Sequence, residues 1–109
     1  MEKFTVYLLT CGLGRYKIGY TSRTAEERAQ ELTYKYRRKY TVLMAVKFNG
    51  DQLDGLTIER MTQRAFRSGG RVEFDEKTQD HFNTLLNKAE AQARFLSAVK
   101  RAYSRMAGL

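Results

Sequence analysis

Hydrophobic positions dominate two short segments near the start of the chain. Phe4–Thr10 and Tyr16–Thr21 are rich in β-branched and aromatic residues, a composition that favours strands. The five residues between them include two glycines, which predicts a hairpin. The predicted register pairs Thr10 with Tyr16, Leu9 with Lys17, and Tyr7 with Gly19. One face of this hairpin is apolar or aromatic throughout and is expected to pack, whereas the opposite face is expected to be free for function.

A helix, a third strand and a second helix follow. Thr24 and Glu27 form the pattern of a capping box, and the helix that begins there is expected to run to about Arg38. Its apolar stripe consists of Ala25, Ala29, Leu32 and Tyr36. Tyr40–Phe48 predicts the third strand. The next amphipathic segment predicts a helix from about Leu53 to Phe66.

The remainder of the chain predicts a short extended segment, Arg71–Phe74, and one long helix. Thr78–Met106 repeats apolar residues at helical spacing, and His81 is expected to cap or decorate the start of this helix. The order strand-strand-helix-strand-helix-(short strand)-helix predicts an α/β fold of the α+β sandwich kind. Its sheet is expected to be small, mainly antiparallel and three-stranded, with helices on its faces. The length fits a single domain over residues 1–109, with a core over about 4–76 and a long C-terminal helix over about 78–106.

Charge narrows the class of partner. The chain has 20 Lys and Arg against 12 Asp and Glu, a net charge of +8, which points to a polyanion and favours nucleic acid over acidic lipid. No apolar run approaches the roughly 18 residues of a membrane span. The single cysteine, Cys11, cannot form a disulfide within the chain, which favours a reducing compartment. We therefore expect a cytoplasmic protein without membrane contact.

Several segments, in order and spacing, resemble the GIY-YIG nuclease superfamily. Residues 5–7 (Thr-Val-Tyr) stand where the G-I-Y strand ends, and residues 16–19 (Tyr-Lys-Ile-Gly) stand at the Y-I-G strand. Residues 21–28 resemble the passage that delivers the helical arginine, and residues 56–60 resemble the helix with the acidic metal ligand. Lys in place of the second Tyr is typical of a phage and bacterial K-I-G subgroup, whose final E-x-F element corresponds to residues 73–75 (Glu-Phe-Asp). The chain departs from the pattern at Thr5, in place of Gly, and at Thr62, where the subgroup often has His.

The resemblance implies a metal-dependent endonuclease or nickase that hydrolyses DNA phosphodiester bonds with weak sequence specificity. Tyr7 would be the general base, with Lys17 on the same face lowering its pKa. Arg28 would grip the phosphate, and Gly19 and Thr21 would leave room for the backbone to approach. Glu59 would bind a single Mg²⁺ or Mn²⁺ ion, with Glu73 as the rival ligand.

Each of these residues also has a purely structural interpretation. Tyr7 suits a half-buried strand, Arg28 could pair with Glu31 or Glu27, and Glu59 could pair with Gln63 or Arg60. The alternative function is therefore a catalytically eroded nucleic-acid-binding or protein-interaction module on the same fold.

Two basic segments are candidates for the DNA-binding surface. The first, which ends the first helix, interleaves cations with tyrosines that could stack on bases; its cations are Lys35, Arg37, Arg38 and Lys39. The second lies on the last helix and includes Arg94, Lys100 and Arg101. The apolar stripe of the last helix would serve a homodimer if the protein is not a monomer. A chain this small leaves no separate sequence-reading domain, so a partner protein could supply specificity.

Overall fold

Among the residues that the structure describes, five strands form one antiparallel sheet in the spatial order β3-β1-β2-β5-β4. A computed structural model describes residues 3–68, 70, 72–74 and 80–108. Along the chain the elements are β1 (Lys3–Gly12), β2 (Arg15–Thr21), α1 (Ala25–Tyr36), β3 (Thr41–Asn49), α2 (Gln52–Ser68), β4 (Val72–Phe74), β5 (His81–Thr84) and α3 (Lys88–Met106). The α+β class agrees with the sequence prediction, but the sheet is larger than the three strands expected.

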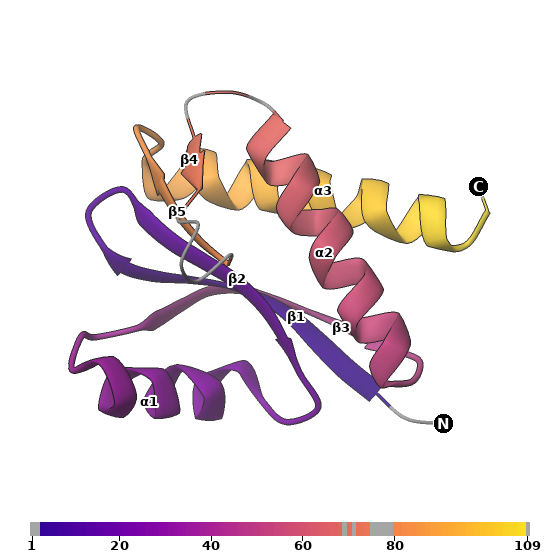
Figure 1. Cartoon of the computed structure of the whole chain (residues 1–109), viewed down its shortest axis with the longest axis horizontal. Coiled ribbons are helices and arrows are strands. Elements are labelled where there is room, and N and C mark those ends of the chain that lie inside the picture. Colours follow the sequence, from indigo (N-terminus) through magenta and orange to yellow (C-terminus); the bar gives the residue numbers. More distant parts are fainter. Residues whose placement is uncertain (1–2, 69, 71, 75–79, 109) are drawn as a thin grey trace.

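The elements form three layers, with α1 on one face of the sheet and α2 and α3 on the other (Figure 1). The larger core lies between the sheet and the pair α2 and α3, and includes Ile58, Phe66, Phe82 and Phe95, all fully buried. The smaller core lies between the sheet and α1, and includes Tyr7, Leu9 and Leu32. Within the described residues, no helix is both long and apolar enough to cross a bilayer.

The register of the β1–β2 hairpin is confirmed, because Thr10 lies opposite Tyr16, Leu9 opposite Lys17, and Tyr7 opposite Gly19. The expectation that one face of this hairpin stays free is wrong. Both faces of β1 are buried from residue 4 to residue 11, since α1 packs on the face that was expected to be open. The candidate side chains on that face therefore lie beneath a helix, where burial changes their protonation.

The ends of the first two helices follow from capping chemistry. The Thr24 hydroxyl accepts from Glu27 N at 3.1 Å, as the sequence predicts for the start of α1. α1 ends at Tyr36 rather than Arg38, because Arg37 adopts a left-handed conformation with φ of 53°. α2 begins after Asp51, whose carboxylate accepts from Asp54 N at 2.9 Å. In return, the Asp54 carboxylate accepts from Asp51 N at 2.9 Å.

The prediction of one helix over Thr78–Met106 is wrong over its first part. Residues 78 and 79 lie outside the described residues, His81–Thr84 form strand β5, and α3 begins only at Lys88. β5 pairs with both β2 and β4, so tertiary pairing overrides the local helical spacing. His81 is thus a buried strand residue and not a helix cap. The cap of α3 is Asn87, which forms a complete capping box with Glu90.

We predict that Asn87→Ala lowers the free energy of unfolding by about 1 kcal/mol, because Glu90 N loses the acceptor that lies 2.8 Å away. Asn87→Asp keeps an acceptor and is the matched control, with a change of only a few tenths of a kcal/mol. Urea unfolding followed by circular dichroism measures both. If a single helix did extend through residue 87, alanine there would stabilise the protein instead.

Candidate active site

The outer edge of β2 joins the sheet to α2. β2 pairs with β5 only over its first three residues, so on this side the residues after them have no neighbouring strand in the described part of the chain, although they pair with β1 on the other side. Ile18 N donates instead to Asp80 O at 3.0 Å, and Ile18 O accepts from Gln63 Nε2 at 2.9 Å. Tyr20 N donates to Glu59 Oε2 at 3.0 Å. The side chains of Glu59 and Gln63 on α2 therefore supply hydrogen-bond partners to this edge of the sheet. The same bonds keep Glu59 against β2.

Tyr7 lies on the α1 side of the sheet, over Gly19. A Cβ at Gly19 would overlap the phenol ring, so glycine is required for the ring to fit. The sequence suggested that Gly19 leaves space for a phosphate, and in the structure that space holds the Tyr7 side chain. Burial raises the pKa of Tyr7 to about 12, although the hydrogen-bonded guanidinium of Arg28 opposes the increase. Tyr7 is consequently a neutral phenol at neutral pH.

Arg28 connects Tyr7 to the surface of α1. Its guanidinium hydrogen-bonds the phenol of Tyr7, and its Nη1 also donates to Glu31 Oε2 at 2.9 Å. Burial lowers the pKa of Arg28, but the hydrogen bonds and charges of Glu31 and Tyr7 outweigh burial. The pKa of Arg28 is therefore raised above its ordinary value. Arg28 therefore makes the pairing with Glu31 that the sequence offered as its structural interpretation, and also a contact with Tyr7 that was not predicted. About a third of its side chain remains exposed, so the guanidinium is open to an anion.

Lys17 is paired with Asp80 and not with Tyr7. The Lys17 side chain is buried, and its ammonium forms an ion pair with the Asp80 carboxylate. This finding corrects the expectation that Lys17 lowers the pKa of Tyr7, because its charge is compensated by Asp80 and the cation that acts on Tyr7 is Arg28. Asp80 was not predicted as a site residue. The signal that could have found it is physical: a lysine facing a core requires a carboxylate partner.

Asp80 also begins a hydrogen-bonded chain that runs beneath α1. His81 Nδ1 donates to Asp80 Oδ1 at 2.9 Å, and His81 Nε2 hydrogen-bonds Tyr40 Oη at 2.9 Å. Burial raises the pKa of Asp80, but the hydrogen bond from His81 and the charge of Lys17 outweigh burial and hold it below its ordinary value. Asp80 is thus an anion whose two oxygens have different buried partners.

Glu59 brings a second carboxylate to the same place. It is half-buried on α2, and its Oε1 lies 3.4 Å from Gln63 Nε2. Burial raises the pKa of Glu59, Lys17 partly opposes this, and the charge of Asp80 raises the pKa further. The structure therefore brings together Tyr7, Arg28, Glu59, Lys17 and Asp80, drawn from both helical layers and from the sheet.

The other predicted residues near the site have different surroundings. Glu73, the rival metal ligand, is exposed on β4 and lines a separate hollow of about 450 Å³ with Asn83 and Thr84. None of the residues brought together around Asp80 lines that hollow. Thr21 accepts from Arg23 N at 3.1 Å in the turn that follows β2. Thr62, at the position where the K-I-G subgroup often has His, is fully buried in the core. Asp75 lies outside the described residues.

The predicted nucleic-acid-binding residues fall into two groups on the surface. Lys35, Arg37, Arg38 and Lys39 are all exposed around the end of α1. On α3, Lys100 and Arg101 are exposed, whereas Arg94 Nη1 donates to Gly70 O at 2.6 Å, beyond the end of α2. Arg94 therefore joins α3 to the end of α2.

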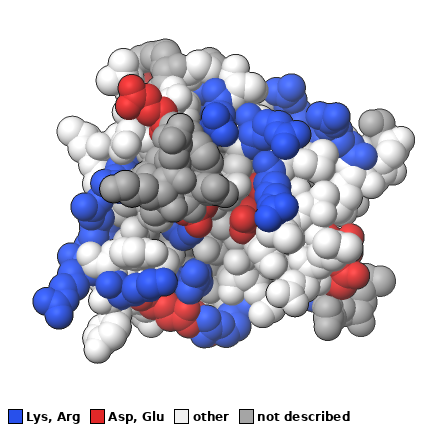
Figure 2. Space-filling model, viewed as in Figure 1, with Lys and Arg blue, Asp and Glu red and all other residues white. Residues whose placement is uncertain are grey.

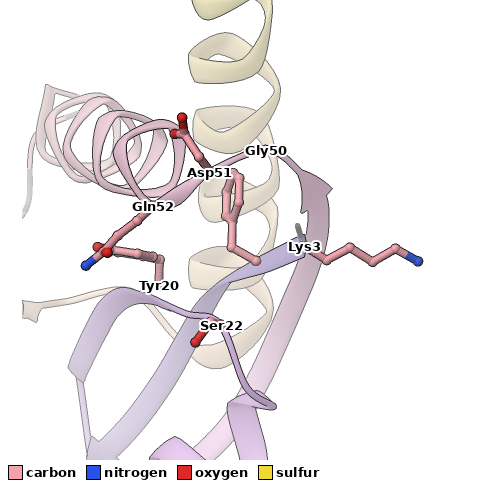
Figure 3. Close-up of a pocket in the computed structure, with 7 residues that line it drawn as sticks. Lys3, Tyr20, Ser22, Gly50, Asp51 and Gln52 are labelled. Atoms are coloured by element: carbon pink, nitrogen blue, oxygen red, sulfur yellow. The ribbon is translucent and has the colours of Figure 1, made fainter. Parts of the chain in front are cut away.

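A hollow of about 470 Å³ lies at the other end of β2 and contains none of the predicted catalytic residues. Figure 3 shows Tyr20 and Gln52 extending side by side at this hollow while Lys3 points away from it. The ring of Tyr20 packs directly on Gly55, where a Cβ would clash with it. The hollow thus borders the contact that seats α2 on β2, and the candidate site lies elsewhere.

We predict that Asp80→Asn lowers the free energy of unfolding by about 3 kcal/mol, because it leaves the buried ammonium of Lys17 uncompensated. Adding Lys17→Met to Asp80→Asn removes the unpaired charge and is expected to recover most of the loss. Urea unfolding of the four members of this double-mutant cycle at pH 7 gives the coupling free energy. Additive losses would show that the ion pair contributes nothing to stability.

Comparison with known protein families identifies a family that is related to the GIY-YIG proteins. The profile of the T5orf172 domain matches residues 5–101, a range that includes every residue of the candidate site. This nuclease-like family is related to the GIY-YIG proteins. Searches of curated proteins and of solved structures found no significant match. The chain therefore belongs to the T5orf172 domain family.

Proposed function

We propose that this protein is a metal-dependent endonuclease or nickase of GIY-YIG type that hydrolyses DNA phosphodiester bonds with weak sequence specificity. The observation that carries the proposal is the convergence of Tyr7, Arg28 and Glu59 at the edge of β2. Phosphodiester hydrolysis requires a base for water and compensation of charge on the phosphoryl oxygens, and these side chains supply such groups. DNA is the proposed partner, and a second protein would add specificity.

Arg28 and Tyr7 have complementary roles in this proposal. The partly exposed guanidinium of Arg28 binds the scissile phosphate and stabilises the negative charge that develops on its oxygens. Tyr7 accepts the proton of the attacking water in the small fraction of molecules in which its phenol is ionised. Lys17 and Asp80 compensate each other's charge and position the strand edge between them.

Glu59 is the residue proposed to hold Mg²⁺ or Mn²⁺. Within the described residues, no three His, Cys, Asp or Glu side chains gather into a metal-binding group, so water would complete the coordination of such an ion. The surroundings fit a hard dication, because burial and the nearby Asp80 disfavour the negative charge on Glu59 and a cation would offset both effects. When bound, the ion stabilises negative charge on the leaving 3′ oxygen.

One observation favours a second candidate function, a DNA-binding module that has lost catalysis. A phenol whose pKa is about 12 is a poor base at neutral pH, and the ammonium expected to activate it is compensated by Asp80. Nicking of supercoiled plasmid in Mg²⁺ or Mn²⁺ separates the two functions, since only the enzyme converts the substrate to open circles. Arg28→Ala is expected to abolish this conversion.

We predict that Glu59→Gln abolishes plasmid nicking and raises the melting temperature at pH 7. Because the pKa of Glu59 is raised in the folded state, its contribution to stability is present below the ordinary value of 4.5 and is lost as pH rises above it. The amide of Gln does not titrate, so the variant avoids this loss of stability. The melting temperatures of the variant and the wild type should therefore converge near pH 4. Mg²⁺ is expected to stabilise only the wild type.

Glu73→Gln is the matched control, because it makes the same change at the rival ligand on β4. Nicking at the wild-type rate and an unchanged response to Mg²⁺ are expected. If Glu73→Gln loses nicking and the stabilisation by Mg²⁺ while Glu59→Gln keeps these two properties, Glu73 is the ligand and the assignment of Glu59 is wrong.

We predict that the cleavage rate rises about tenfold per pH unit between roughly pH 6 and 9, because the pKa of Tyr7 is about 12 and its ionised fraction grows in that proportion. Single-turnover rates on a labelled duplex measure the profile. Tyr7→Phe should remove activity, whereas the exposed Tyr103→Phe should keep both rate and slope. A plateau beginning below pH 8 would assign the rate to another group.

A further inference from the structure

A shallow groove separates α2 from α3 on the side of the molecule away from α1. Its volume is about 440 Å³, and it lies where the two helices pack together. Apolar side chains form the floor: Met61 and Ala65 from α2 and Ala102 from α3. Arginines from both helices form the rim: Arg64, Arg101 and Arg105. Arg101 and Arg105 belong to the basic last helix that the sequence offers as a nucleic-acid-binding surface, whereas Arg64 was not predicted.

The three rim arginines have no acidic partner in the described part of the chain. All three are exposed, and none of their guanidinium groups forms an ion pair or a hydrogen bond with a described residue. The positions three and four residues away on either helix hold no carboxylate, and Arg101 and Arg105 are themselves four residues apart. Like charges at this spacing weaken a helix by a few tenths of a kcal/mol. The protein thus maintains a local excess of positive charge that an external anion would relieve.

α2 carries both Glu59 of the candidate active site and, a few residues further along, the α2 side of the groove. Arg60, which directly follows Glu59, lies one helical turn before Arg64. At 1.5 Å per residue, the distance along the helix from Glu59 to Ser68 is about 14 Å. About four phosphates of one DNA strand span this length, at 3.4 Å of helix axis each. Figure 2 shows basic side chains gathered over α2 and α3 on one face of the molecule.

The chemistry of the lining favours a duplex over a single strand. Arginine forks bind phosphate oxygens in pairs, and the small apolar floor carries no group that hydrogen-bonds a base edge. No aromatic side chain lines the groove, so it lacks the stacking surface on which unpaired bases bind. The tyrosines of residues 34–40 lie instead around the end of α1.

We propose that the groove between α2 and α3 binds the phosphate backbone of duplex DNA beside the cleavage site. This inference rests on the proposed function, because it assigns a DNA-binding surface to that same site. Arg64, Arg101 and Arg105 hold the flanking duplex, while Arg28 binds the scissile phosphate. Binding through the rim arginines contributes affinity and orientation, not the chemical step.

The test is the salt dependence of binding to a labelled 24-base-pair duplex, measured by fluorescence anisotropy in EDTA over a series of KCl concentrations. The test variant is Arg64→Gln with Arg101→Gln and Arg105→Gln. The control variant removes the same charge from exposed lysines outside the groove: Lys3→Gln, Lys47→Gln and Lys88→Gln. Each lost phosphate contact reduces the slope of log affinity against log salt by about 0.9, so we expect a decrease of about 2.7 for the test variant and less than one for the control.

The outcomes separate the two proposals. If the wild type binds no DNA, the proposed function fails together with this inference. If the wild type binds and the test variant keeps a slope equal to that of the control, the groove is not the binding surface, although the proposed function stands. An equal change for a 24-nucleotide single strand would overturn the duplex assignment. Should the triple variant not fold, Arg64→Gln and Arg101→Gln are tested singly, each with an expected decrease of about 0.9.

Discussion

The backbone groups of β2 beyond Lys17 require hydrogen-bond partners, and the rest of the molecule is arranged around this requirement. A buried strand edge without partners costs free energy for every unpaired N–H and C=O. Here Asp80 O, Gln63 Nε2 and Glu59 Oε2 supply the missing bonds. One edge therefore determines where α2 sits, where β5 begins and where the carboxylate of Glu59 points. In a fully paired sheet the same side chains would have no reason to meet.

Burial of Lys17 has consequences beyond its own ion pair. A lysine at the centre of a sheet requires an anion, and Asp80 provides it from the residue before β5. The same carboxylate holds His81, which in turn binds Tyr40 beneath α1. The positive charge of Lys17 is thereby compensated within the protein itself. In the described part of the chain, Arg28 is the partly exposed cation beside the Tyr7 phenol.

Local patterns predicted the hairpin, its register and the first two helices, because alternation and capping residues act within a few positions of the chain. Tyr7, Arg28 and Glu59 could be selected as candidates for the same reason. Strand β5 could not be predicted from local patterns. Phe82 and Leu86 fit the apolar stripe of a helix as well as they fit a strand and the loop after it. Only the pairing of this segment with Tyr16 and its neighbours on β2 selects the strand. The pairing of Asp80 with Lys17 and the raised pKa of Tyr7 depend on long-range packing, so neither could be predicted from the sequence.

The site joins residues 7, 17, 28, 59 and 80, and this spread has a consequence for biosynthesis. During synthesis the hairpin and α1 emerge first, and their contacts span few residues, so they are free to form early. Glu59 joins only after α2 has docked, and Asp80 only when β5 pairs with β2 at the end of more than sixty intervening residues. A nascent or truncated chain lacks the carboxylates even when its hairpin is native. The order of the segments therefore delays assembly of the proposed nuclease until nearly the whole domain has left the ribosome.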